Sequence, residues 1–96
     1  MRLRVRRLAR AEIDAAFTWY LARSPRAAER FLVAVDAAIK AIATAPRRQP
    51  VIHGRLRRLL LSGFPYAVYY KVYPAVVSVV GVIHGRRHPA AWLRRA

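Results

Sequence analysis

The residues best suited to chemistry lie near the C-terminal end of the sequence, where two histidines flank a pair of arginines: His84, Arg86, Arg87 and His88. Guanidinium groups can hold a phosphate, and a nearby histidine can exchange a proton with a ribose hydroxyl near neutral pH. The segment is therefore compatible with ribonuclease chemistry. The alternative, which we favour, is a solvated strand end whose arginines bind an acidic partner and whose histidines form local hydrogen bonds.

A second group of cations consists of Arg55, Arg57, Arg58 and Lys71, which we expect on two neighbouring strands. Together these residues are suited to bind a phosphate backbone or an acidic peptide. The alternative is that cations on an edge strand prevent edge-to-edge aggregation.

The charge of the chain is strongly one-sided. Its 96 residues carry a net charge of +15 at pH 7, and no acid follows Asp36. A surface with this imbalance repels itself and attracts anions, so we expect the partner to be nucleic acid or an acidic protein. The length and the apolar content of 56% predict a single folded domain over residues 1–96.

Several site types are not expected. Cysteine is absent and the three histidines have no accompanying acids, so the sequence predicts neither a metal site nor a cofactor. We find no signal peptide and no apolar stretch long enough to span a membrane, so we expect a cytoplasmic protein without membrane association.

The N-terminal half reads as a strand followed by two helices. Residues 2–7 alternate polar and apolar residues, and apolar residues recur with helical spacing over 9–23 and 25–44. Ser24 and Pro25 are typical of a helix start, so the helices should form an antiparallel hairpin. Trp19 lies off the apolar stripe of the first helix and, like Trp92, is expected to pack in the core or at an interface.

The C-terminal half reads as a small sheet. A loop over residues 46–54 should precede strands over 55–61, 66–72 and 75–83, with a short helical or extended tail over 90–96. The order β-α-α-β-β-β predicts an α+β fold with a helical hairpin packed on a largely antiparallel sheet. Because the last strand is apolar on both faces, we expect a partner to cover the second face.

The element order and a series of short motifs resemble the RelE/ParE toxin superfamily, and most closely its ParE-like and plasmid-stabilisation branch. The resemblance covers almost the whole chain. It rests on Glu12-Ile13, Trp19-Tyr20, Ser24, Ala28, Arg30-Phe31, Gly63-Phe64-Pro65-Tyr66, Tyr70, His84, Arg86-Arg87, Pro89 and Trp92.

This resemblance implies the toxin of a type II toxin–antitoxin system, in hetero-oligomeric complex with an antitoxin that wraps an extended acidic segment around it. Members of the ParE-like branch inhibit DNA gyrase, whereas members of the RelE-like branch cleave messenger RNA on the ribosome. Nucleases of the second branch commonly place an arginine on the middle strand and a tyrosine or histidine near the C-terminus. This sequence has Ala67 at the first place and lacks the terminal tyrosine. It keeps His84 and Arg86, but the His-x-Arg-Arg-x-Pro ending is common in the ParE-like branch. The ParE-like function is therefore our leading expectation.

A ribosome-dependent endoribonuclease is the alternative, with His84 as acid or base and with Arg57, Arg58 and Arg86 on the phosphate. A third alternative is a domain that only binds antitoxin and operator DNA. We expect the target or the antitoxin to be bound by Arg55, Arg57, Arg58, Lys71, Arg86, Arg87 and Trp92.

Overall fold

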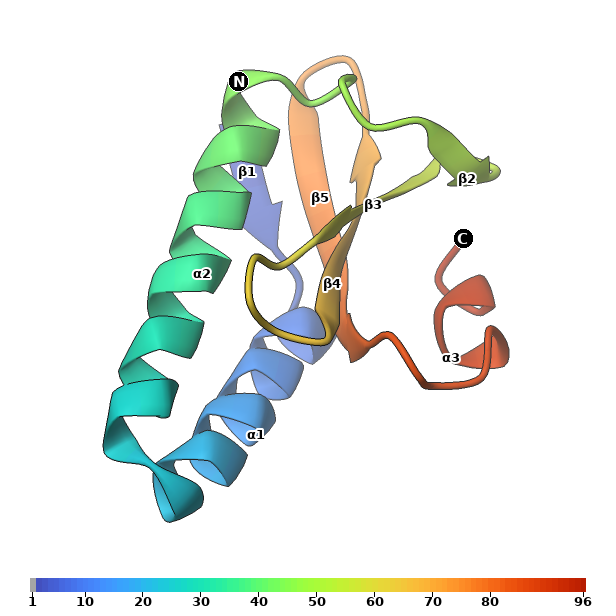
Figure 1. The fold of residues 1–96 in the computed structure, drawn as a ribbon. Helices are drawn as coiled ribbons and strands as arrows, with labels where there is room; N and C mark the ends of the chain where they lie inside the picture. Colours follow the sequence, from blue (N-terminus) through green and yellow to red (C-terminus); the bar gives the residue numbers. More distant parts are fainter. Residues whose placement is uncertain (1) are drawn as a thin grey trace.

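A five-stranded sheet with helices on both faces makes up residues 2–96, the part of the chain that this computed structural model describes (Figure 1). The helical hairpin covers one face, and a short C-terminal helix lies on the other (Figure 1). In chain order the elements are β1 (Arg2–Val5), α1 (Arg7–Arg23), α2 (Pro25–Thr44), β2 (Val51–His53), β3 (Leu56–Leu60), β4 (Tyr66–Val72), β5 (Val76–His84) and α3 (Ala90–Leu93).

The helical hairpin forms as its sequence predicts. The Ser24 hydroxyl accepts a hydrogen bond from the Ala27 N–H at 3.2 Å, and Pro25 occupies the first helical position. Both residues lower the cost of starting α2, because a helix leaves its first N–H groups without internal partners. Phe31 and Ile42 then point from α2 into the core.

The sheet order is β1-β5-β4-β3-β2, with β1 parallel to β5 and the other pairs antiparallel. The predicted α+β class and helical hairpin are confirmed, with one strand more than expected. Residues 51–53, which we predicted as loop, form β2. Pro46 and Pro50 before this segment and Gly54 after it are typical of a loop, so the sequence does not predict a strand here. The register of β2 with β3 is irregular.

The helix-facing side of the sheet holds the larger part of the core. Tyr70 is completely buried there, and its hydroxyl donates to the Pro46 carbonyl at 3.1 Å. Burial raises the pKa of the Tyr70 phenol, and the nearby Arg57 guanidinium offsets part of this rise. The hydrogen bond fixes the chain where it leaves α2 for the sheet.

The second face of the sheet is covered by the chain's own C-terminal segment, residues 90–96, and not by a partner as we expected. The Trp92 ring stacks on the Tyr69 ring, with centroids 5.9 Å apart and planes 18° apart. Leu56, Ala67 and Ile83 are buried around this pair. β5 is therefore buried on both faces, as its sequence predicts, but the residues that cover its second face belong to the same molecule.

A bulge in β5 keeps its side chains on the correct faces. Tyr69 pairs with Gly81 and Tyr70 with Val79, so Val80 has no opposite residue on β4. The Val80 carbonyl instead accepts a hydrogen bond from the Arg95 guanidinium at 3.1 Å. The extra residue thus provides an anchor for the C-terminal segment.

The carboxylate of Glu12, on α1, forms the main polar anchor of the same segment. Arg95 donates to both carboxylate oxygens, at 2.6 and 3.0 Å, and both side chains are 19% exposed. One of these oxygens also accepts the Val82 N–H at 3.0 Å. Gly81 leaves room for the guanidinium, since a Cβ at that position would lie 2.5 Å from Nη1 of Arg95.

Gly81→Ala should therefore release the C-terminal segment while the core stays folded. The new methyl group displaces the Arg95 guanidinium, and losing charge-assisted hydrogen bonds of this kind costs about 1.5–3 kcal/mol. Hydrogen exchange at the Leu93 and Arg95 amides should become roughly 10- to 100-fold faster. Gly85→Ala is the matched control, because its Cβ would meet the Pro65 carbonyl at an ordinary 3.4 Å. Unchanged exchange in Gly81→Ala would show that the ion pair does not hold the segment.

Candidate functional site

His84 lies at the end of β5, paired with Tyr66 of β4, and its ring is 5.2 Å from the Tyr66 ring in an edge-to-face contact. Its Nδ1 accepts the Arg86 N–H at 3.0 Å. That contact leaves Nε2 as the atom available for proton transfer. The histidine is thus partly buried and held in one orientation by the turn that follows it.

A groove runs beside His84, between α1 and β5. It has a volume of about 230 Å³, and Trp19, Tyr66, His84 and Arg87 are among the residues that line it. We call it the α1–β5 groove. Trp19 is 50% exposed, and the Arg23 guanidinium lies 3.7 Å above its ring. Half of its surface is therefore available to a partner, which fits the interface role expected for this tryptophan and not packing in the core.

The edge of β5 is open along part of this groove. Pairing of β1 with β5 ends at Val79, so within residues 2–96 no strand lies beside the rest of β5 on that side. The Glu12 carboxylate takes the Val82 N–H in place of a neighbouring strand. The Val80 and His84 carbonyls accept from Arg95 and from the Arg87 N–H, so only a short part of this edge is left to which an extended peptide can add.

Arg57 supports the loop before β2. Its guanidinium donates to the backbone carbonyls of Arg47 and Gln49, at 3.3 and 2.5 Å. The side chain therefore lies on the helix-facing side of the sheet, together with Tyr70, its register partner. A role in phosphate binding would require Arg57 to give up these contacts.

Arg58 lies on the opposite face, with its guanidinium 6.0 Å from the Trp92 ring. Arg58 pairs with Tyr69 of β4, whereas His84 pairs with Tyr66 of β4, three residues further along that strand. His84 itself is on β5, two strands away from β3. The strand spacings place the two backbones about 14 Å apart. The structure does not bring the expected nuclease set of His84, Arg86, Arg57 and Arg58 together into one site.

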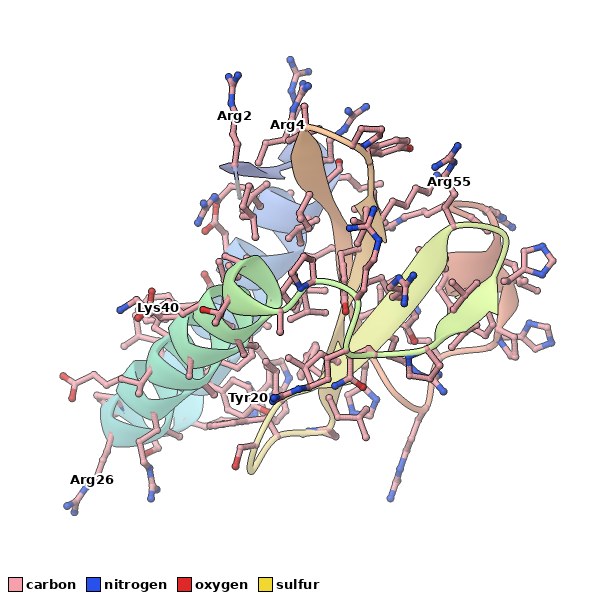
Figure 2. The ribbon with its side chains drawn as sticks, turned by 90° about the horizontal axis from the view of Figure 1, so that it is seen from above. Arg2, Arg4, Tyr20, Arg26, Lys40 and Arg55 are labelled. Carbon is pink, nitrogen blue, oxygen red and sulfur yellow. The ribbon has the colours of Figure 1, made fainter. Side chains whose placement is uncertain are left out.

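The other cations of the expected binding surface divide into two kinds. Lys71 donates from Nζ to the backbone oxygen of Ala96 at 2.9 Å, so it helps to hold the C-terminal segment. Arg55 lies in the exposed turn between β2 and β3, with its guanidinium 5.3 Å from the Tyr73 ring. Arg86 and Arg87 are exposed after β5. Side chains project outward over much of the surface, Arg55 among them (Figure 2).

Some residues that shape the site were not among the site residues predicted from the sequence. Glu12 and Arg95 form the anchor of the C-terminal segment, but they are 83 positions apart, and no local pattern connects them. Trp19 gave a usable signal, since it lies off the apolar stripe of its helix. Its exposure is what such a position predicts.

Residues 2–96 show neither a metal site nor a membrane-spanning helix. No group of three or more histidine and acidic side chains in this range is placed to hold a metal ion. None of its helices is both long enough and apolar enough to cross a membrane.

Comparisons with known proteins give one family and one fold. Residues 3–89 match the family model described as the ParE toxin of the type II toxin–antitoxin system parDE. The fold resembles a solved structure of the chromosomal ParDE system from P. aeruginosa, with a TM-score of 0.78 and 19% identity, covering 88% of this chain and 95% of the other. At that identity the likeness is one of fold. No curated protein matches the sequence.

Proposed function

Since the chain belongs to the ParE toxin family of type II toxin–antitoxin systems, we propose that it acts by binding and inhibiting DNA gyrase. It would act as a binding protein in the cytoplasm, and an antitoxin would neutralise it. The gyrase target is an inference from the ParE-like branch that the sequence resembles, and the arrangement of the candidate residues supports it.

The observation that carries the proposal is the separation of the residues that RNA cleavage would need. Arg58 and His84 lie on different faces of the sheet, and Arg57 holds a loop. Ala67, where nucleases of the superfamily commonly have arginine, is completely buried in the cluster that includes Trp92. A face filled in this way has no room for the scissile phosphate beside the middle strand.

A second candidate, RNA cleavage, keeps one observation in its favour. His84 has its Nε2 free of the turn contact, and Arg86 and Arg87 follow it closely. These residues could serve a reaction built around the α1–β5 groove instead of the sheet face. Because RNA cleavage would then depend on His84, a substitution at His84 separates RNA cleavage from gyrase inhibition.

We place the antitoxin segment along the α1–β5 groove and the helical hairpin. The groove offers a half-exposed tryptophan, cations on both sides and an incompletely paired strand edge. An acidic, extended segment matches all three features, because it supplies backbone hydrogen bonds and negative charge together. The exposed Arg86 and Arg87 would contribute charge contacts at one end.

Purified protein should inhibit supercoiling by DNA gyrase and cause cut plasmid to accumulate in the presence of ATP. The measurement is gel analysis of a relaxed plasmid incubated with gyrase and increasing toxin, with the toxin–antitoxin complex as the control. Full supercoiling activity at toxin concentrations well above that of gyrase would contradict the proposed target.

His84→Asn separates the two functions. Asparagine keeps an acceptor near the position of Nδ1, so the turn to Arg86 should survive, but it cannot exchange protons at neutral pH. We expect gyrase inhibition and growth arrest to stay within about twofold of the parent protein. If growth arrest is lost while the thermal unfolding midpoint is unchanged, the histidine acts in catalysis and the nuclease function gains support; general acid–base catalysis is worth about 100- to 10,000-fold.

Trp19→Ala should weaken antitoxin binding. Removing a central aromatic side chain from an interface costs about 2 kcal/mol or more, which corresponds to about a 30-fold lower affinity. Isothermal titration calorimetry with the antitoxin encoded beside the toxin gene measures the change. Leu93→Ala is the matched control, because Leu93 is 41% exposed on α3, across the sheet from the helical hairpin. Equal affinities for the parent protein and Trp19→Ala would move the antitoxin away from this groove.

A further inference from the structure

A second cavity lies where α1 begins beside β5, and the Glu12–Arg95 ion pair separates it from the α1–β5 groove. Its volume is about 490 Å³, and it is lined by Arg6, Arg7, Leu8, Lys71, Tyr73, Ser78, Val80 and Arg95. We call it the basic cavity. It is distinct from the α1–β5 groove, with which it shares no lining residue.

The charge of the basic cavity is not balanced from within. Glu12 is paired with Arg95 through two hydrogen bonds. Among residues 2–96, Arg6 and Arg7 form no ion pair with an acid. Several cations in one cavity repel one another, so an anion that enters is bound more tightly than on an open surface.

The beginning of α1 adds a further positive element. Arg6 donates its N–H to the Val79 carbonyl, which fixes the start of the helix against β5. The first turn of α1 contains no acid, and no side chain caps it. The amides of Arg7 and Leu8 precede the first helical hydrogen bond, from Arg10 to Arg6, so the positive end of the helix dipole is uncompensated.

The walls of the basic cavity favour an occupant larger than a single carboxylate. Leu8 is 54% exposed, and the Tyr73 ring lies below the Arg55 guanidinium. These groups offer apolar contact for a sugar or a base next to the cations. The Ser78 side chain, buried at 5% exposure, lies in the cavity wall and adds a hydroxyl that can donate to an oxyanion.

The cations continue beyond the cavity, as a polyanion would require. Arg4 of β1 pairs with Ser78 of β5. Arg2 lies two residues before Arg4 and therefore on the same face of β1. Figure 2 shows Arg2 and Arg4 projecting beyond the sheet, away from the end of the helical hairpin that carries Arg26. Arg55 borders the other side through Tyr73.

We propose that the basic cavity binds a backbone phosphate of a nucleic-acid strand, with Arg6, Arg7 and the first amides of α1 as its ligands. Arg2, Arg4 and Arg55 then contact neighbouring phosphates. The proposed phosphate contact is independent of which target the toxin inhibits, because every residue that lines the basic cavity comes from this chain. It gives the free toxin a direct affinity for nucleic acid.

The test compares two double variants that remove the same charge. Arg6→Gln/Arg7→Gln empties the basic cavity of its unpaired arginines, whereas Arg26→Gln/Arg30→Gln removes two exposed arginines from the beginning of α2. Binding of a dye-labelled DNA oligonucleotide, single-stranded and duplex, is followed by anisotropy over a range of salt concentrations. We expect about a tenfold or greater loss of affinity and a salt slope smaller by about two for the first variant, and less than a threefold loss for the second.

Equal losses in the two double variants would overturn the proposal, because net charge alone would then explain binding. Ser78→Ala provides a variant with almost no effect on packing, and it should weaken binding about threefold if the hydroxyl contacts the phosphate. Unchanged affinity in both Ser78→Ala and Arg6→Gln/Arg7→Gln would place the oligonucleotide elsewhere.

Inorganic pyrophosphate and a synthetic acidic peptide distinguish the source of the anion. Shifts of the Leu8 and Ser78 amide signals on addition of the oligonucleotide, with competition by pyrophosphate, support a phosphate site for nucleic acid. If pyrophosphate shifts these signals and the oligonucleotide does not, the site serves free phosphate compounds and the proposal is wrong. It is also wrong if the acidic peptide alone shifts them.

Discussion

The carboxylate of Glu12 joins three parts of the molecule that are far apart in sequence. It projects from α1, accepts the Val82 N–H at the open edge of β5, and holds Arg95 of the C-terminal segment. A mostly buried charge of this kind is stable because each of its oxygens has a donor. The position of Trp92 on the sheet, and hence the filling of the second face, depends on this contact. With only four acids in the chain, the commitment of one to this site also leaves the surrounding cations without compensation.

The same ion pair separates two regions of the surface that differ in character, since Glu12 lines the α1–β5 groove and Arg95 lines the basic cavity. The α1–β5 groove combines an exposed aromatic ring with an incompletely paired strand, which suits a peptide. The basic cavity combines arginines with a helix N-terminus, which suits an oxyanion. A toxin that must be silenced by one partner while it acts on another benefits from such a division, because the two partners then need not compete for the same contacts.

Local patterns in the sequence were sufficient for α2, for the cap at Ser24 and for β4, whose bounds agree with those predicted. β1 ends at Val5 and α1 begins at Arg7, each two residues earlier than predicted. They failed for β2, because three residues between turn-forming residues give no periodic signal. The cover of the second face could not be predicted either, since the stacking of Trp92 on Tyr69 depends on how the tail folds back. The same reason explains the candidate site: residue types such as those of Arg57 and Arg58 can be read from the sequence, but the face on which each lies depends on the pairing of β3 with β4.

The bulge at Val80 has a consequence for how the length of this chain can vary in evolution. Side chains alternate between the faces of a strand, so the loss of any residue of β5 other than the extra one would exchange the two faces on one side of the deletion. A deletion at Val80 itself would leave the strand regular, but it would remove the carbonyl that accepts from Arg95. Homologues that keep the C-terminal segment in place should therefore tolerate substitutions in β5 far more readily than single-residue insertions or deletions, and length changes should accumulate in the loops on either side of β2.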